Sequence, residues 1–261
     1  MFFRDVINHF SIWELFVINL AILMVISLTA FYIGRFFICP EKKDKEYSKS
    51  TDNVLSILGS GYGVFLGFVI ITLWNHYLNV QKIVYHEADA LSVVVRDLEV
   101  LPPSATVPLK SSLVNYLHSV RNDEWEKMKK GERSEKTWNN AYKLYRSFQE
   151  YTPHSTKENL YYRQIMNYLD GLLKDRRDRL IASKSILNDE LRVALILGAV
   201  MIIFLSSLLK ANEGSIRIFA NFCLATVIGF NLTLALSFDF PFSGSISVNN
   251  APFYQGVLSK L

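Results

Sequence analysis

The stretch GSGYGVFLGF, residues 59–68, carries four glycines within an apolar run. No Asp, Glu, Lys or Arg lies between Asp52 and Lys82, and this gap exceeds the roughly 20 residues that a helix needs to cross the hydrocarbon core of a bilayer. Three further apolar runs are free of charge, at residues 15–34, 193–209 and 218–238. The sequence therefore predicts an integral membrane protein, surrounded by a lipid bilayer, with four transmembrane helices.

The segment between the second and third spans is polar but periodic. In VQKIVYHEADALSVVVRDLEVL, residues 80–101, apolar residues recur at the three-and-four spacing of a helix face. No alternating strand pattern is visible, so the expected fold class is all-α. The expected domains are residues 1–78 with spans one and two, an extramembrane helical bundle at 79–190, spans three and four at 191–238, and a non-helical C-terminal tail at 239–261.

Local signals divide the bundle into helices. Expected helix starts are Pro108, Ser134 and the capping box of Ser155 with Glu158. Expected stops are Pro102, Pro103, Gly131 and Pro153. No proline lies between Pro153 and the third span, so we expect the last bundle helix to run unbroken into that span, and the second span to continue into the 80s.

The glycines of the second span form one ridge, because Gly59, Gly63 and Gly67 recur every fourth residue. Small residues let helices approach closely in lipid, where association depends on van der Waals packing. Two interpretations stay open. The ridge is either a packing seam inside one protomer or part of a helix that lines the centre of an oligomer.

Polar groups inside the spans are few, and no span has a charge in its middle, which argues against proton-coupled transport. The polar side chains, which we expect to form interhelical hydrogen bonds, include Asn19, Ser206, Ser207, Asn221 and Thr233.

Other site classes find little support. In YHEADA, His86, Glu87 and Asp89 lie close together, but no further histidine has ligand spacing, so we expect no metal or cofactor. Catalytic motifs are missing from the sequence, so no enzyme is expected. A net charge of only +4 with interleaved acids argues against nucleic acid. Only Cys39 and Cys223 are present, which indicates no disulfide framework.

Two stretches near the membrane ends are unusual. The basic run KDRRDRL and its surroundings favour contact with anionic lipid headgroups or, in an oligomer, a vestibule that attracts anions; its residues are Arg176, Arg177, Arg179 and Lys184. The tail SFDFPFSGSISVNNAPF is apolar but broken, and we expect it to lie at the interface or dock on the bundle. Its marked residues are Asp239, Pro241, Phe242, Gly244, Pro252 and Phe253.

EADAL at residues 87–91, RDLEVLP at 96–102, the glycine-rich second span and the tail together resemble the bestrophin-like domain of unknown function of bacterial membrane proteins. The resemblance implies distant kinship with bestrophins, oligomeric anion channels whose second helices line the pore. Residues implied on or near the pore are Gly59, Gly63, Phe65, Gly67, Phe68 and Trp74. The acidic calcium clasp and Phe-rich neck of bestrophins have no residue-by-residue match, so calcium gating is not implied.

The leading hypothesis is a homo-oligomeric channel, with a pentamer as one size, that passes small inorganic ions, with a weak preference for anions. The alternative is a non-conducting membrane scaffold or sensor whose bundle binds a partner. Basic residues flank the spans on both sides, including Lys42, Lys43 and Lys210 in the short connections, so the positive-inside rule gives no decision. The resemblance favours the bacterial inner (plasma) membrane, with the bundle and termini in the cytoplasm.

Overall fold

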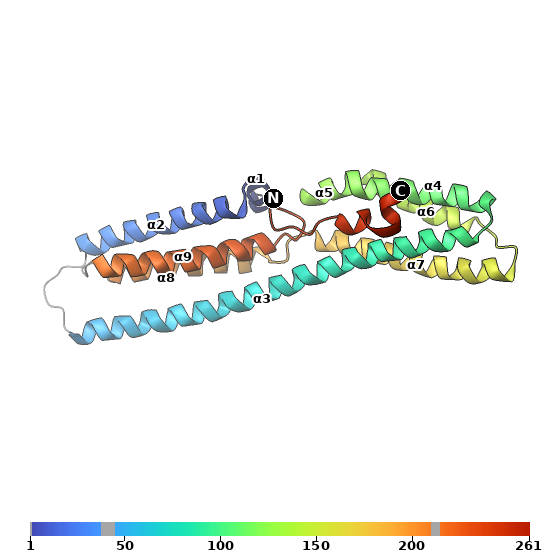
Figure 1. The fold of residues 1–261 in the computed structure, drawn as a ribbon. Coiled ribbons are helices and arrows are strands. Elements are labelled where there is room, and N and C mark those ends of the chain that lie inside the picture. The colour runs from blue at the N-terminus through green and yellow to red at the C-terminus, as the bar shows by residue number, and fades with distance from the viewer. Residues whose placement is uncertain (1, 38–44, 210–214) are drawn as a thin grey trace. The chain divides into compact units, whose positions relative to one another are not determined.

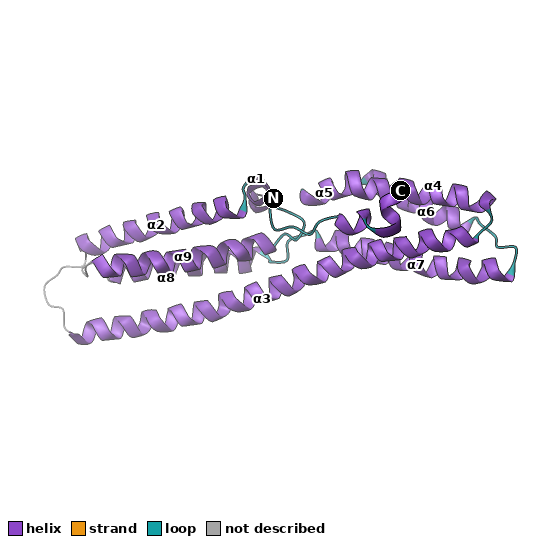
Figure 2. Ribbon diagram, viewed as in Figure 1, coloured by secondary structure: helices purple, strands orange, loops and turns teal. Residues whose placement is uncertain are grey.

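The computed structural model describes residues 2–37, 45–209 and 215–261. Cys39, Lys42, Lys43 and Lys210, named above, lie outside the described residues. Within these ranges the regular elements are all helices and no strand occurs (Figure 2). The expected all-α fold class is confirmed.

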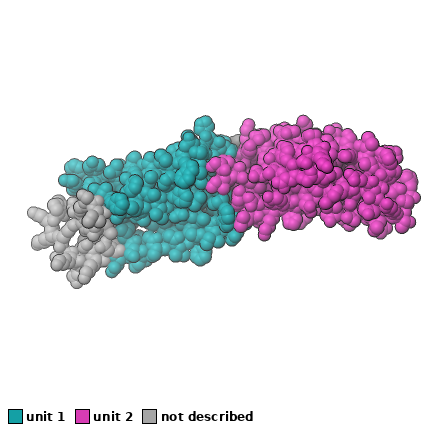
Figure 3. Space-filling model, in the orientation of Figure 1, with its two compact units in different colours: residues 1–75, 185–239 teal, residues 76–184, 240–261 magenta. Residues whose placement is uncertain are grey.

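The chain divides into two compact units (Figure 3). Unit 1 contains residues 1–75 and 185–239, and unit 2 contains residues 76–184 and 240–261.

Unit 1 is formed by long apolar helices (Figure 1). Its elements are α1 (Phe2–His9), α2 (Ile12–Phe37), the first part of α3 (Lys45–Asp97), α8 (Asp189–Leu209) and α9 (Ser215–Phe238). Helix α2 packs against both α8 and α9. Among the described residues, four helices are long and apolar enough to cross a membrane, which confirms the four expected spans. The single helix α3 runs through residue 97 and so continues into the 80s as expected.

Interhelical hydrogen bonds join the spans of unit 1. The Asn19 amide on α2 donates to Thr233 Oγ1 on α9 at 2.8 Å. The hydroxyls of Ser27 on α2 and Ser207 on α8 lie 2.8 Å apart, and Ser206 donates to Asn221 Oδ1 at 2.7 Å. Such bonds satisfy polar groups that have no water partner in lipid, and they confirm the expected role of these side chains.

Unit 2 is a bundle built from the second part of α3 and the helices that follow it. These are η1 (Leu98–Val100), α4 (Pro103–Ser119), the π-helical turn η2 (Val120–Glu124), α5 (Trp125–Lys129), α6 (Glu135–Gln149) and α7 (Thr156–Ala182), with η3 (Ala251–Tyr254) and η4 (Gly256–Lys260) from the tail. Helix α4 packs against α6. The core holds fully buried side chains such as Leu91, Leu113, Leu144 and Leu172.

Most local signals have the expected roles. Ser134 accepts a hydrogen bond from the Thr137 backbone at 2.9 Å, and Ser155 accepts one from Glu158 at 3.1 Å. The start at Pro108 is wrong, because α4 begins at Pro103 and Pro108 lies inside it. Pro103 occupies the first helical turn, where its missing N–H removes no helical hydrogen bond.

The expected continuous helix from the bundle into the third span is also wrong. Helix α7 ends at Ala182 and α8 begins at Asp189. Within unit 1, the Asp239 carboxylate accepts hydrogen bonds from the backbone N–H groups of Ile186 at 2.9 Å and Leu187 at 2.7 Å. A side chain far along the chain thus supplies the partners that a continuous helix would otherwise provide.

Candidate functional site

The glycine ridge of α3 is open within the protomer. A Cβ atom added at Gly59, Gly61, Gly63 or Gly67 would meet nothing within 4 Å. The space beside these glycines is therefore open in the described part of the chain, which argues against a packing seam inside one protomer. The spacing of the glycines gave no information about which surface would face them.

A neighbouring side of α3, about 90° around the helix from Gly63, contacts the rest of unit 1. Leu66, Val69 and Leu73 are buried there. The Tyr62 hydroxyl donates to the backbone oxygen of Leu195 on α8 at 2.9 Å. Its ring lies against Gly198, where a side chain would collide with it.

The residues implied near a pore are divided between two sides of α3. Phe68 is 67% exposed, and it lies about 140° around the helix from Gly63. Phe65 leans toward Tyr62, with ring centroids 6.4 Å apart. Trp74 is partly covered by Phe238 at 5.4 Å, yet it remains 44% exposed. No single face of the helix carries all of them.

A fully buried carboxylate marks the start of the tail motif. Asp239 Oδ2 accepts from Arg192 Nη2 at 2.7 Å, and the Ser185 hydroxyl contacts both carboxylate oxygens. Arg192 also pairs with Asp189 at 2.7 Å, but the Asp189 side chain is 90% exposed. Asp239 thus neutralises Arg192 while it holds the loop before α8. Asp239 was predictable from the tail motif, whereas Arg192 was not, since their pairing joins positions 47 residues apart.

The rest of the tail docks on the bundle of unit 2, as expected. Phe242 and Phe253 are buried and approach the Trp125 ring with centroid distances of 5.5 and 6.0 Å. Gly244 has a positive φ of 75°, which permits the turn between them. The Pro241 carbonyl accepts from the Val248 backbone at 2.8 Å. Pro252 lies in the 3-10 turn η3, which begins at Ala251, so the tail is not wholly without helical turns.

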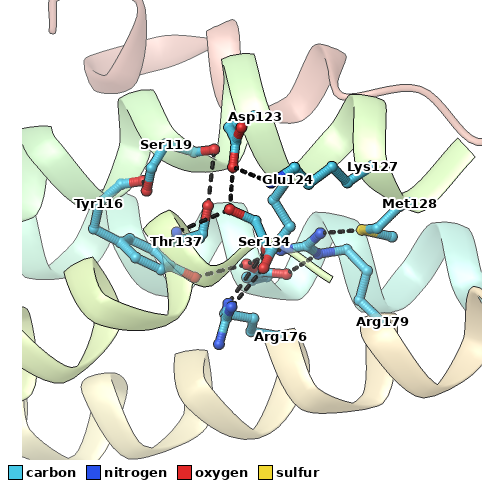
Figure 4. Close-up of polar contacts among 11 residues, drawn as sticks. Tyr116, Ser119, Asp123, Glu124, Lys127, Met128, Ser134, Thr137, Arg176 and Arg179 are labelled. Atoms are coloured by element: carbon cyan, nitrogen blue, oxygen red, sulfur yellow. Dashed lines mark hydrogen bonds and ion pairs between the residues drawn. The ribbon is translucent and has the colours of Figure 1, made fainter. Parts of the chain in front are cut away.

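A second buried charge cluster lies inside the bundle (Figure 4). Arg179 on α7 is fully buried and pairs with Glu87 on α3 through two bonds of 2.6 and 2.9 Å. Its Nη2 also donates to Glu124 of the π turn at 2.7 Å. Glu124 in turn accepts from Arg176 Nη2 at 2.5 Å. Two guanidinium groups and two carboxylates therefore neutralise one another inside the bundle.

Tyr116 on α4 completes the cluster, because its hydroxyl donates to Glu87 Oε1 at 3.0 Å. Complete burial and the neighbouring Glu87 carboxylate raise the pKa of Tyr116 well above its usual value. Burial alone would lower the pKa of Arg179, but Glu87 and Glu124 outweigh it and the pKa lies above its usual value. The cluster is thus charged and fully paired, which suits it to fixing helices rather than to proton transfer.

The structure corrects the expectation for two of the four basic residues. Arg176 and Arg179 are buried and paired with acids of the bundle, so they lack the exposure that lipid contact or a vestibule requires. Arg177 and Lys184 are exposed, and their role stays a prediction.

The sequence held a signal for this cluster. Glu87 falls between Val84 and Leu91 on the apolar face of its helix, and Arg176 and Arg179 continue the buried spacing of Leu172. A charge within an apolar stripe indicates a buried partner.

The acidic groups offer no obvious metal centre. Glu87 pairs with Arg179, whereas His86 and Asp89 are exposed. Among the described residues, no three His, Cys, Asp or Glu side chains lie close enough to share an ion.

These features define a class of protein, an all-helical multi-pass membrane protein with a helical domain between its second and third spans. The family model of the bestrophin-like domain matches residues 21–253, and the chain belongs to this family. The family and its solved homologues support an ion channel class. A comparison with curated proteins gives no match.

Solved structures show the same fold. A variant of a bacterial bestrophin homologue from Klebsiella pneumoniae has a TM-score of 0.69 at 16% identity, over 94% of each chain. A second variant of a Klebsiella pneumoniae homologue has a TM-score of 0.66 at 17% identity, over 90% of this chain and 94% of the other. A structure described as a membrane protein has a TM-score of 0.68 at 16% identity, over 91% and 93% of the two chains.

Proposed function

We propose that this protein is a homo-oligomeric ion channel whose pore is lined by the membrane part of α3. The observation that carries the proposal is the open surface of this helix, where the glycines meet no described neighbour and Phe68 is 67% exposed. A helix that shows one glycine-rich side and one aromatic side suits a ring of copies around an axis. Family membership supports the same class of function.

The two sides of α3 suit two roles in such a ring. The glycine side allows the close approach of a helix from the neighbouring copy. The Phe68 side, with the exposed residues Val64 and Ile71, provides an apolar constriction that gates by dewetting. The passage carries small inorganic ions, and an anion preference follows from the family and from the exposed residues Arg177 and Lys184.

We place the channel in the bacterial inner membrane with the bundle in the cytoplasm. A cysteine at the exposed position Glu132, in a chain without its native cysteines, tests this orientation. A membrane-impermeant maleimide should label it only after the cells are broken. Labelling of intact cells would place the bundle outside.

Conduction is tested with purified protein in planar bilayers. The parent protein should pass current above the background of empty membranes, and Phe68→Ala should change the conductance because it widens an apolar constriction. The control is Val25→Ala on α2, an exposed position that we place in lipid, and it should leave the current unchanged. Gly63→Leu should lower the number of subunits in the oligomer, as measured by light scattering.

Well-folded oligomers that pass no current would favour the scaffold alternative instead. If Gly63→Leu leaves the oligomer intact but alters its conductance, the glycine side of α3 lines the pore and the Phe68 side contacts the neighbouring copy.

A further inference from the structure

Arg121 of the π turn is a buried cation held by backbone carbonyls of the tail. Its Nε donates to the Phe253 carbonyl at 3.1 Å, and its Nη2 contacts the same oxygen. It also donates to the carbonyl of Leu258 at 2.8 Å and to a backbone oxygen of Leu261 at 2.9 Å. Its guanidinium lies 4.4 Å from the centre of the Tyr254 ring.

This arginine differs from the other two in the bundle. Arg176 and Arg179 pair with side-chain carboxylates, whereas Arg121 donates to backbone oxygens of the tail. Carbonyl dipoles compensate a desolvated charge less fully than an opposite charge does. Burial accordingly lowers the pKa of Arg121. Water could satisfy the same N–H groups if the tail moved away, so the bound and released states of this side chain are closer in free energy than for a buried ion pair.

The tail also covers the charge cluster of the bundle. The ring centre of Phe253 lies 6.0 Å from the guanidinium carbon of Arg179. The backbone carbonyl of the same Phe253 accepts the hydrogen bond from Arg121. The segment that carries Phe253 consists of short 3-10 turns, and Gly256 has a positive φ of 58°. Isolated turns of this kind have little stability of their own. The binding of the tail to the bundle therefore depends on its aromatic contacts and on the hydrogen bonds from Arg121.

We propose that residues 246–261 form a detachable strap, that Arg121 is its latch, and that opening of the strap admits water to the Glu87–Arg179–Glu124 cluster. Opening is a local transition that leaves α6 and α7 folded. It would loosen the helices that the cluster holds, and so the strap provides the bundle with a regulatory element. This inference does not depend on ion conduction.

Hydrogen exchange of the full-length protein in detergent, followed by mass spectrometry, tests the proposal. In Arg121→Gln, amides of residues 246–261 should exchange about tenfold faster or more, while peptides from α6 keep the parent rate. The matched control is Arg146→Gln, an exposed arginine of α6, which should leave the strap unchanged. Arg121→Lys should give an intermediate rate, because one ammonium cannot reach three carbonyls as a planar guanidinium does.

Two outcomes would overturn the proposal. Unchanged strap exchange in Arg121→Gln would show that Arg121 is no latch. Equal acceleration of the strap and α6 would show that the tail unfolds only with the whole bundle. If Arg121→Gln does not fold, the parent protein still decides, because a detachable strap requires its hydrogen-bonded amides at Phe253 and Leu258 to be less protected than those of α6. Equal protection in the parent would exclude it.

Discussion

The ring of Tyr62 on α3 occupies the space that a side chain on Gly198 of α8 would need. A Cβ at position 198 would lie 2.6 Å from the ring atom Cδ2, closer than real contacts allow. Gly198 on α8 therefore makes room for the Tyr62 ring, through which α3 contacts α8.

Gly198→Ala should destabilise the protein by about 1–3 kcal/mol, because the Tyr62 ring must shift and its hydrogen bond to Leu195 is strained. Chemical denaturation in detergent measures the change. The matched control is Gly171→Ala in α7, whose added methyl meets nothing within 4 Å and which should stabilise its helix by about 0.5–1 kcal/mol. Equal effects of the two substitutions would contradict the assigned role of Gly198.

Arg179→Met should cost about 3–5 kcal/mol, because it leaves Glu87 and Glu124 buried with insufficient positive charge. Unfolding of unit 2, followed by circular dichroism in urea, measures the loss. Arg146→Met removes an exposed pair with Glu150 and should change stability little. The double variant Glu87→Met with Arg179→Met should recover part of the loss, and a strictly additive result would argue against direct coupling.

Alkaline pH should destabilise the bundle through Tyr116. Its folded pKa is raised by burial and by Glu87, so its contribution is complete below the unfolded pKa of about 10 and declines as pH rises above that value. The melting temperature of Tyr116→Phe should therefore fall less than that of the parent between about pH 9 and about pH 11, on either side of the unfolded pKa of about 10. Tyr142→Phe, at a 63% exposed position, should follow the parent. Identical slopes for all three proteins would refute this assignment.

Asp239→Asn should destabilise unit 1 by about 3 kcal/mol, because the buried guanidinium of Arg192 loses its buried partner. Asp189→Asn offers a control on the same arginine, since that carboxylate is 90% exposed, and its effect should be small. Thermal melting in detergent compares the two. A larger loss for Asp189→Asn would mean that the exposed carboxylate is the main partner.

The spans were predictable because charge-free runs of sufficient length have few stable alternatives in a chain with charges on either side of them. The capping roles of Ser134 and Ser155 were equally local. The break between α7 and α8 was not predictable in this way, because the acceptor that stabilises it, Asp239, follows Leu187 by 52 positions.

The charge cluster was missed for a related reason. KDRRDRL indicates a basic run that contacts lipid headgroups or lines a vestibule, since the acids that pair with Arg179 lie 92 and 55 positions away. The surroundings of the α3 glycines were also not predictable, because their spacing defines a ridge on the helix but does not indicate which surface faces that ridge.

The π turn at Val120–Glu124 affects where the length of this chain can vary. A π turn accommodates one more residue than an α turn, so it absorbs that residue locally, whereas deletion of one residue from the regular helix α4 would rotate everything that follows by about 100°. Trp125 would then point away from Phe242 and Phe253, and the tail would lose its aromatic contacts with the bundle. Deletions of one residue should therefore occur in exposed loops or at this turn of related chains, and be selected against within α4.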